Sequence, residues 1–323
     1  MAGASSEAGA ESALQARAAE RATPVALTIA GSDSGGGAGV AADLKAFAHC
    51  GVHGACVLTA VTAQSTMSVA AIHELPAGIV EAQFDAVLAD LDVGAVKVGM
   101  LGGAAAAGAV ARALARLAEA VPVVVDPVLV ASTGARLLTP QAERILLGEI
   151  VPRATVLTPN LHEARALLGE PPQTARRRGA SAADTVPGED ERAVADRLLE
   201  GLLALGPRAV VLTGGPGEDS PDEPDGGRVT DLFGMAGEDR AVEIAGARAP
   251  GGADHGSGCT HSALLAAELA LGRGPLQAAR RARELTGAAI AGGLRDVGAG
   301  NGPVDVIGLA ALRAAELAVR PAS

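Results

Sequence analysis

Short, largely apolar segments alternate with longer helix-forming segments along most of the 323 residues, and this alternation limits the fold more than any other feature of the sequence. The apolar segments fall at residues 25–30, 55–63, 96–100, 121–125, 155–157 and 209–213. The helix-forming segments fall at residues 40–49, 77–90, 104–119, 139–147, 161–168, 191–205, 276–292 and 306–317. Strands that are apolar on both faces are typical of a parallel sheet covered by helices on both sides. The sequence therefore predicts an α/β fold with a central, mostly parallel sheet.

No gap in this alternation marks a second domain, so residues 24–323 are expected to form a single domain. Residues 1–23 are rich in Ala, Ser and Glu and contain no apolar stretch of the signal-peptide type, which predicts a disordered tail. Two segments near 170–190 and 214–227 are rich in Pro, Gly and charged residues and are expected to be flexible insertions. The segments 228–233 and 241–244 are predicted to pair as a hairpin after the second insertion.

Composition narrows the class of protein. Apolar residues make up 49% of the chain, but there is no Trp or Tyr and there are only 3 Phe, so the core must consist of Ala, Val and Leu. A net charge of −11 argues against a nucleic-acid or anionic-membrane partner, and no apolar run reaches the ~18 residues of a membrane span. Three widely spaced cysteines indicate a reducing compartment. We expect a cytoplasmic protein with a small-molecule substrate, and a homodimer is compatible with the sequence.

Small and polar residues follow the predicted strands. In an open parallel sheet, ligands gather beyond the carboxyl ends of the strands. The segments at this edge are residues 31–39, Gln64, 99–100, 126–128, 158–160 and 213–215. Together they predict a small-molecule site on one rim of the sheet.

The glycine-rich stretch at residues 253–261 runs into an apolar, helix-forming segment. Glycines at a helix start leave free N–H groups at the positive end of the helix dipole, which suits an anion such as phosphate. Cys259 is expected to face the bound group, with a pKa lowered by the helix N-terminus. A merely structural, capped turn is the alternative interpretation. His255 and His261 bracket Cys259, so a Cys–His hydrolase is a further alternative.

Two other patterns carry chemistry. Asn160 and Glu163 have the spacing of a helix capping box, and Glu163 also suits a partner of Mg²⁺ carried by a nucleotide. Asp126 ends a Val-rich strand, where a carboxylate is desolvated unless it is paired, so a metal or hydrogen-bond role is expected. Asp43 is either a solvated helix residue or part of a site. The Gln64 amide both donates and accepts, which matches an aminopyrimidine edge.

Known phosphate-binding fingerprints fit poorly. Residues 37–42 nearly match the dinucleotide fingerprint, but Ser32 and Asp33 separate the glycines from the strand, and no acidic residue closes the second strand. A P-loop needs Gly-Lys, and neither Lys45 nor Lys97 follows a glycine. Both motifs are therefore set aside.

Six sequence motifs occur in this order along the chain: AGSDSGGGAGVAADLKAF, VTAQST, VKVGMLG, VVVDPVLVASTGARLL, LTPNLHEARALLG and HGSGCTHSA. Together they resemble the bacterial hydroxymethylpyrimidine/phosphomethylpyrimidine kinases of thiamine biosynthesis, which belong to the ribokinase-like superfamily. The resemblance covers about residues 24–308. It implies a three-layer, ribokinase-like fold. It also implies phosphorylation of 4-amino-5-hydroxymethyl-2-methylpyrimidine, and then of its monophosphate, with ATP and Mg²⁺.

The resemblance implies roles for individual residues. The pyrimidine pocket corresponds to Gly31, Asp43, Gln64, Met100 and Val128. The ATP side corresponds to Asn160, Thr213 and Gly215, and the Mg²⁺ side to Asp126 and Glu163. The anion hole corresponds to Gly256, Ser257 and Gly258, with Cys259 as the catalytic residue. The backbone N–H groups would stabilise charge on the transferring phosphoryl while the cysteine takes the hydroxyl proton.

Three positions depart from the family pattern. Thr213 stands where the family usually has the lysine of Lys-Gly-Gly-His, Asp254 lies in the place of the usual Asn-Thr, and His261 replaces an apolar residue. An arginine from residues 176–178, or Arg228, is hypothesised to replace the lysine. The departures also motivate an alternative, a pyrimidine-binding regulatory homologue with impaired phosphoryl transfer. A pyridoxal kinase on the same fold is the other alternative.

Overall fold

The structure is a computed structural model, and it describes residues 23–130, 137–170, 191–214, 227–238, 240–249 and 253–313. The predicted tail at residues 1–23 and the two predicted insertions lie almost entirely outside the described residues. Their flexibility, and the single domain expected over residues 24–323, stay predictions.

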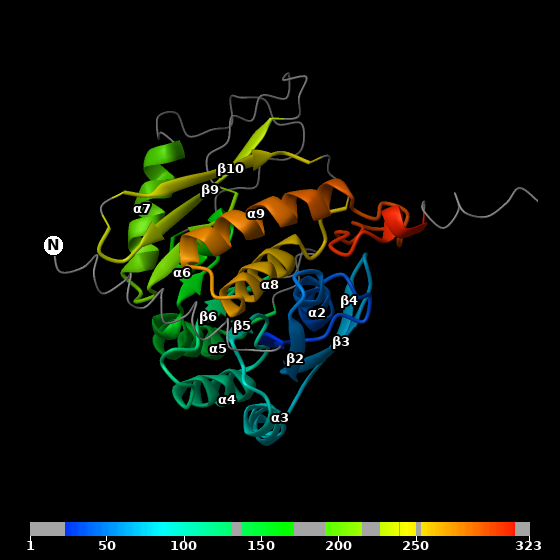
Figure 1. Cartoon of the computed structure of the whole chain (residues 1–323). Coiled ribbons are helices and arrows are strands. Elements are labelled where there is room, and N and C mark those ends of the chain that lie inside the picture. Colours follow the sequence, from blue (N-terminus) through cyan, green and yellow to red (C-terminus); the bar gives the residue numbers. More distant parts are fainter. Residues whose placement is uncertain are drawn as a thin grey trace, which may run out of the picture.

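A sheet of eight strands forms the centre of the described chain (Figure 1). Its strands, in spatial order, are β10 (Val242–Ala247), β9 (Arg228–Met235), β8 (Ala209–Leu212), β7 (Val156–Leu157), β6 (Val123–Val125), β5 (Ala95–Val98), β1 (Val25–Ala30) and β2 (His53–Leu58). Adjacent strands in the part of the sheet from β8 through β7, β6, β5 and β1 to β2 are parallel, whereas β9 is antiparallel to both β8 and β10. The predicted mostly parallel sheet and the predicted β9–β10 hairpin are therefore confirmed.

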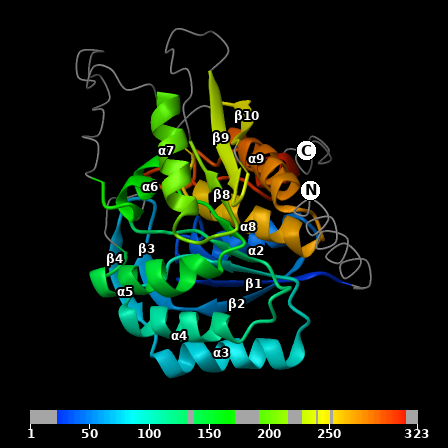
Figure 2. The ribbon, with the colours of Figure 1, turned by 90° about the vertical axis from the view of Figure 1, so that its left-hand side faces the viewer.

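Helices cover both faces of the sheet, and each face has its own apolar core. One face carries α3 (Ala77–Asp90), α4 (Ala104–Ala115), α5 (Pro140–Ile145), α6 (Leu161–Leu167) and α7 (Glu191–Leu203). The other carries α2 (Gly39–His49), α8 (Ser257–Ala270) and α9 (Pro275–Ala291). Figure 2 shows α3 and α4 below β1 and β2, with α8 and α9 on the opposite side.

Alternate residues of each strand supply the two cores. Leu27 packs toward α3 and α4, whereas its neighbour Ala26 packs toward α2 and α8. The same division separates Val123 and Val125 from Val124. Because the side-chain period of a strand is two residues, a strand with helices on both faces has to be apolar throughout. This is the physical origin of the uninterrupted apolar runs in the sequence.

The apolar run at residues 55–63, expected as one strand, is two strands. β2 ends at Leu58, and β3 (Ala60–Gln64) leaves the main sheet to pair antiparallel with β4 (Val69–Glu74). Thr59 lies between them, fully buried, and its hydroxyl donates to the carbonyl of Met100 at 2.7 Å. β4 was not predicted because its residues are mostly exposed and show no alternation. The separation of β3 brings Gln64 to the rim of the main sheet.

Several helix ends differ from the predicted ones. The helix expected at 104–119 ends at Ala115, and the one expected at 139–147 continues instead into a π-helical turn (Leu146–Ile150) and a 3₁₀ turn (Val151–Arg153). Of the helix expected at 306–317, only residues 309–313 are helical within the described part of the chain. Among the described helices, none is long and apolar enough to cross a membrane.

Candidate active site

A cavity of about 560 Å³ lies at the carboxyl ends of the parallel strands. Its lining includes twelve of the residues singled out in the sequence: Gly31, Gln64, Met100, Asp126, Val128, Asn160, Glu163, Thr213, Gly256, Ser257, Gly258 and Cys259. Gly215 lies outside the described residues, and Asp43 does not line the cavity. The topology of the sheet thus gathers segments that are more than 200 residues apart in sequence, such as those around Gly31 and Gly256.

The predicted anion-binding turn contains Gly256 at the start of α8. Gly256 has a φ of +78°, a left-handed conformation that favours glycine, and a Cβ at this position would overlap the carbonyl oxygen of Gly37. Gly258 and Cys259 occupy the first turn of α8, where backbone N–H groups have no intrahelical acceptor. The cavity wall here therefore carries free N–H groups and the positive end of the helix dipole.

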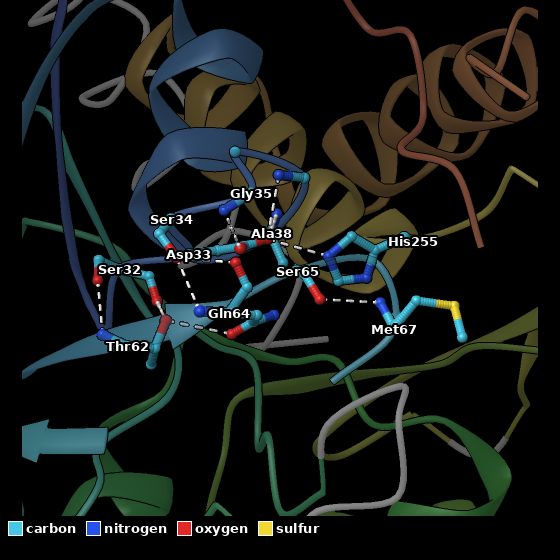
Figure 3. A network of polar contacts seen from close by, with 12 residues as sticks. Ser32, Asp33, Ser34, Gly35, Ala38, Thr62, Gln64, Ser65, Met67 and His255 are labelled. Atoms are coloured by element: carbon cyan, nitrogen blue, oxygen red, sulfur yellow. Dashed lines mark hydrogen bonds and ion pairs between the residues drawn. The ribbon is translucent and has the colours of Figure 1, made fainter. Parts of the chain in front are cut away.

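A contact between Asp33 and His255 joins the first glycine-rich loop, residues 31–39, to this turn (Figure 3). The Asp33 carboxylate accepts hydrogen bonds from the backbone N–H groups of Gly35, Gly37 and Ala38, and its Oδ2 lies 2.9 Å from Nε2 of His255. Burial acts to raise the pKa of Asp33, but these donors outweigh it and the net shift is downward. Both residues lie in segments that were predicted to form the site, but the contact between them was not predicted, although an aspartate two residues before a glycine run was a usable signal.

Lys97 is the other residue that the sequence reasoning missed. Its side chain is fully buried in β5, and Nζ lies 3.0 Å from both oxygens of Asp43 and 3.7 Å from Oδ2 of Asp126. Burial acts to lower the pKa of Lys97, but the negative charges beside it raise the pKa overall, so the ammonium is retained. The signal in the sequence was a lysine inside an otherwise apolar strand.

The structure corrects the expected position of Asp43. Its carboxylate is fully buried, pairs with Lys97 and accepts a hydrogen bond of 2.6 Å from the hydroxyl of Thr28. It therefore lies behind the cavity in this structure, and a direct contact with substrate stays a prediction.

The structure also contradicts the expected low pKa of Cys259. Burial raises the pKa of this thiol to about 12, and the carboxylates of Asp126 and Asp43 act in the same direction. Lys97 and a hydrogen bond from the backbone of Gly39 oppose them without reversing the shift. Sequence reasoning considered only the helix N-terminus, because the neighbouring carboxylates come from distant strands and helices. In the ligand-free protein Cys259 is a thiol.

Asn160 and Glu163 form the predicted capping box at the start of α6. Asn160 Oδ1 accepts from the Glu163 N–H at 2.9 Å, and Glu163 Oε2 accepts from the Asn160 N–H at 3.0 Å. Burial first, and then the charge of Asp126, raises the pKa of Glu163 to about 8. Two carboxylates that repel each other at a cavity wall fit a divalent cation, which would relieve the repulsion. Among the described residues, no cluster of three metal-ligating side chains occurs, so such a cation would need ligands from a substrate.

Glu163→Gln is expected to stabilise the metal-free protein at about pH 9 and to change its stability little at about pH 5. Because the folded pKa of Glu163, about 8, lies above its ordinary value of 4.5, the folded protein holds a proton that the unfolded chain releases. Stability therefore falls as the pH rises between these values, and the neutral glutamine removes this loss. Thermal unfolding in EDTA at both pH values measures the effect. The control is Glu119→Gln, which changes an exposed glutamate. If Glu163→Gln changed the melting temperature equally at both pH values, the raised pKa of Glu163 would be contradicted.

Gln64 also lines the cavity, next to the first glycine-rich loop. Its backbone N–H donates to the Ser34 hydroxyl at 2.7 Å, and that hydroxyl donates to its carbonyl oxygen at 2.8 Å (Figure 3). Its side-chain Oε1 lies 3.3 Å from the hydroxyl of Thr62, which donates to it. These contacts hold the backbone of Gln64 in place and leave the side-chain Nε2 to donate to a ligand.

An apolar wall adjoins Gln64. Met100 packs so closely over Gly31 that a Cβ there would lie 2.9 Å from the methionine Cε. Val128, Val130 and Leu137 continue the lining. A flat apolar ring with a polar edge would find complementary surroundings here.

The hydrolase alternative lacks its required geometry. His255 Nε2 is bound to Asp33, and His261 Nδ1 lies 3.4 Å from the hydroxyl of Thr286. In addition, burial raises the pKa of the Cys259 thiol, whereas that mechanism needs a thiolate. The arrangement therefore does not form the activated Cys–His pair of that mechanism.

A family model described as phosphomethylpyrimidine kinase matches residues 33–305, which is most of the chain and includes all of the cavity lining except Gly31 and Ser32. The chain belongs to the phosphomethylpyrimidine kinase family. A hydroxymethylpyrimidine/phosphomethylpyrimidine kinase of Rhizobium meliloti (strain 1021) is 43% identical over 283 residues, which cover 87% of this chain and 96% of that relative. One from Haemophilus influenzae is 38% identical over 280 residues, covering 86% and 95%.

Solved structures confirm the ribokinase-like fold. The pyridoxal kinase from Staphylococcus aureus in complex with AMP-PCP and pyridoxal aligns with a TM-score of 0.72 and 28% identity, covering 90% of this chain and 96% of that one. A phosphomethylpyrimidine kinase from Clostridium difficile 630 aligns with a TM-score of 0.63 and 30% identity, covering 83% and 98%. This member of the phosphomethylpyrimidine kinase family is therefore a kinase, a phosphate-transferring enzyme.

The resemblance to the family predicts a lysine at position 213, where this chain has a threonine. Thr213 lines the cavity beside Asn160, with which it forms an isolated parallel bridge. Of the arginines hypothesised to replace the lysine, residues 176–178 lie outside the described residues, and Arg228 does not line the cavity. Asp254 does line it, and the side-chain amide of Asn301 donates to its carboxylate.

Proposed function

We propose that this enzyme transfers the γ-phosphoryl group of ATP to the hydroxyl of 4-amino-5-hydroxymethyl-2-methylpyrimidine, and then a second phosphoryl group to the monophosphate, in thiamine biosynthesis. The supporting observation is that one cavity is lined by the Gln64 amide, by apolar side chains and by the glycine-rich start of α8. The names of the relatives support the same substrates. The three free cysteines and the use of ATP support a cytoplasmic location.

The residues of the anion-binding turn have a direct role in this reaction. The free N–H groups at the start of α8 would stabilise charge on the transferring phosphoryl group. The substrate oxygen forms a bond to the γ-phosphorus as the bond from this phosphorus to the β,γ-bridging oxygen breaks, and ADP leaves. Cys259 accepts the hydroxyl proton. Because burial raises the pKa of this thiol, it must first release its proton to water as the ligands bind, and Lys97 is the resident cation that favours the resulting thiolate.

Asp126 and Glu163 would hold Mg²⁺ together with oxygens of the nucleotide. The ion would neutralise charge on the phosphates when it is bound. Ser262 orients Asp126, since its hydroxyl donates to Oδ2 at 3.0 Å. This serine lies one helical turn beyond Cys259 and belongs to the same α8 face.

Pyridoxal phosphorylation is the second candidate function, because pyridoxal kinases are among the structural neighbours at a TM-score of 0.72. Purified protein is incubated with Mg-ATP and, separately, the hydroxymethylpyrimidine, its monophosphate and pyridoxal, and ADP formation is measured. We expect turnover of both pyrimidines. Turnover of pyridoxal alone would replace the proposal, and pyrimidine binding without turnover would favour the regulatory homologue.

A further inference from the structure

Arg283, in the middle of α9, has a buried guanidinium group that lines the cavity and makes only long contacts with other protein groups. The residue is 8% exposed and lines the cavity. Its Nε has no hydrogen-bond partner and lies 3.6 Å from Oδ2 of Asp231, and its Nη2 lies 3.4 Å from the carbonyl of Val229. A guanidinium has five N–H donors, and burying them without short partners is costly. The ligand-free protein therefore leaves this cation incompletely satisfied.

The surroundings of Arg283 are shaped to hold it in this place. Gly246 of β10 leaves room for the guanidinium, since a Cβ there would lie 3.1 Å from both Nε and Nη2. Asp231 shares its carboxylate between Arg283 and the backbone N–H of Gly214, to which Oδ1 is bound at 2.9 Å. Gly214 directly follows Thr213, the position at which a family lysine is missing. Arg283 is thus linked through one carboxylate to the loop that lacks a cation.

His261 adds a second unsatisfied group to the same wall. It is 4% exposed, lines the cavity, and its Nε2 has no hydrogen-bond partner. Its Nδ1 lies 3.4 Å from the hydroxyl of Thr286, which lies three residues after Arg283 on α9. Two buried polar groups, from α8 and α9, therefore lack partners on one wall of the cavity.

The charges around the cavity favour the use of Arg283 by an anionic ligand. The lining carries the carboxylates of Asp33, Asp126, Glu163, Asp231 and Asp254, and the guanidinium groups of Arg248 and Arg283. Lys97 is held by its own two aspartates behind the wall. A polyphosphate entering so acidic a site needs protein cations in addition to a metal ion.

We propose that Arg283 binds the phosphate chain of the nucleotide and supplies the positive charge that Thr213 cannot. The guanidinium exchanges its loose contact with Asp231 for charge-assisted hydrogen bonds to phosphate oxygens. His261 Nε2 is the second polar contact on this wall. The inference rests on the proposed function, because it names residues that recognise the nucleotide in the same site.

Calorimetric titration of ADP in EDTA tests this assignment without catalysis. Arg283→Met is expected to weaken ADP binding about tenfold or more and to leave adenosine binding unchanged, because a charge-assisted hydrogen bond is lost. Arg283→Lys retains the charge and is expected to fall between Arg283→Met and wild type. Affinity for the hydroxymethylpyrimidine alone, measured in the same way, is expected to stay at the wild-type value in both variants.

Asp231→Asn separates a binding role from a structural ion pair. It keeps an oxygen for the Gly214 N–H but removes the charge that competes for Arg283, so ADP binding is expected to strengthen several-fold. A purely structural pair predicts that Asp231→Asn and Arg283→Met change ADP affinity in the same direction, and that result would overturn the inference. Equal ADP affinity of Arg283→Met and wild type would also overturn it.

Two further comparisons complete the test. If Arg283→Met does not fold, the double variant Arg283→Met/Asp231→Asn replaces it, because no unpaired buried charge remains. This double variant is expected to bind ADP more weakly than Asp231→Asn alone, and equal binding would overturn the inference. Wild-type protein that binds neither ADP nor AMP-PCP, even with Mg²⁺, would refute the proposed function itself. If the wild-type protein binds ADP but Arg283→Met binds it equally well, only the proposed role of Arg283 is refuted.

Discussion

Cys259→Ala is expected to lower kcat by roughly 10²–10⁴-fold, with a smaller change in KM, because a general base acts mainly in the transition state. The N–H groups of the anion-binding turn belong to the backbone and remain in the variant, so part of the rate enhancement is retained. We propose that substrate binding depends on Gln64 and the apolar wall, which the substitution leaves unchanged. Steady-state kinetics with the hydroxymethylpyrimidine measures both constants.

Cys56→Ala is the matched control for this experiment. Cys56 is a free, partly buried cysteine in β2 that does not line the cavity, so its loss is expected to leave kcat near the wild-type value. An unchanged kcat for Cys259→Ala would remove the thiol from the mechanism. The raised pKa of Cys259 gives a second readout, because a protonated thiol reacts slowly with iodoacetamide. Rapid alkylation of Cys259 at neutral pH in the ligand-free enzyme would contradict that pKa.

Lys97→Met is expected to destabilise the protein by about 3–5 kcal/mol, the usual cost of removing one partner of a buried ion pair. Lys97 is fully buried, and its loss leaves the carboxylates of Asp43 and Asp126 without a cation between them. The methionine replaces most of the volume of the lysine stem, so the effect reports charge rather than a cavity. Urea unfolding of both proteins at neutral pH measures the difference in the free energy of unfolding.

The chain contains one other lysine, which provides the control. Lys45 lies on α2, partly exposed, and donates to the carbonyl of Gly36 at 2.7 Å, so Lys45→Met is expected to cost about 0.5–1.5 kcal/mol. The double variant Lys97→Met/Asp43→Asn is expected to recover much of the loss, because one unpaired buried charge is removed. If Lys97→Met costs no more than Lys45→Met, the buried charge cluster contributes little to stability.

The local patterns of the sequence predicted the parallel sheet and the glycine-rich helix start, and the structure shows both; that this start binds an anion stays a prediction. A strand with helices on both faces is mostly apolar, so the runs ending at Ala30 and Val125 could be recognised from the sequence alone, although Thr28 lies within the first of them. The glycines before α8 were readable because a helix start leaves free N–H groups whatever lies around it. The capping box of Asn160 and Glu163 is equally local, and it formed as predicted.

Features that depend on distant segments were decided by the tertiary structure. The division of the run at 55–63 into β2 and β3 depends on the partner strand β4, whose own residues carry little signal. The contact between Asp33 and His255 joins residues 222 positions apart. Neither follows from a local pattern, because hydrogen-bond partners far along the chain are set by topology.

The pKa of Cys259 likewise depends on one local effect and on several effects of the tertiary structure. The sequence by itself determined that Cys259 lies at the start of a helix, where the dipole lowers a thiol pKa. The fold surrounds it with Asp126 and Asp43 and buries it, and these effects raise its pKa to about 12. Burial and Coulomb interactions depend on distances through space rather than along the chain. The sequence therefore determined the fold class and the positions of the chemical groups, whereas only the tertiary structure decided their ionisation and their partners.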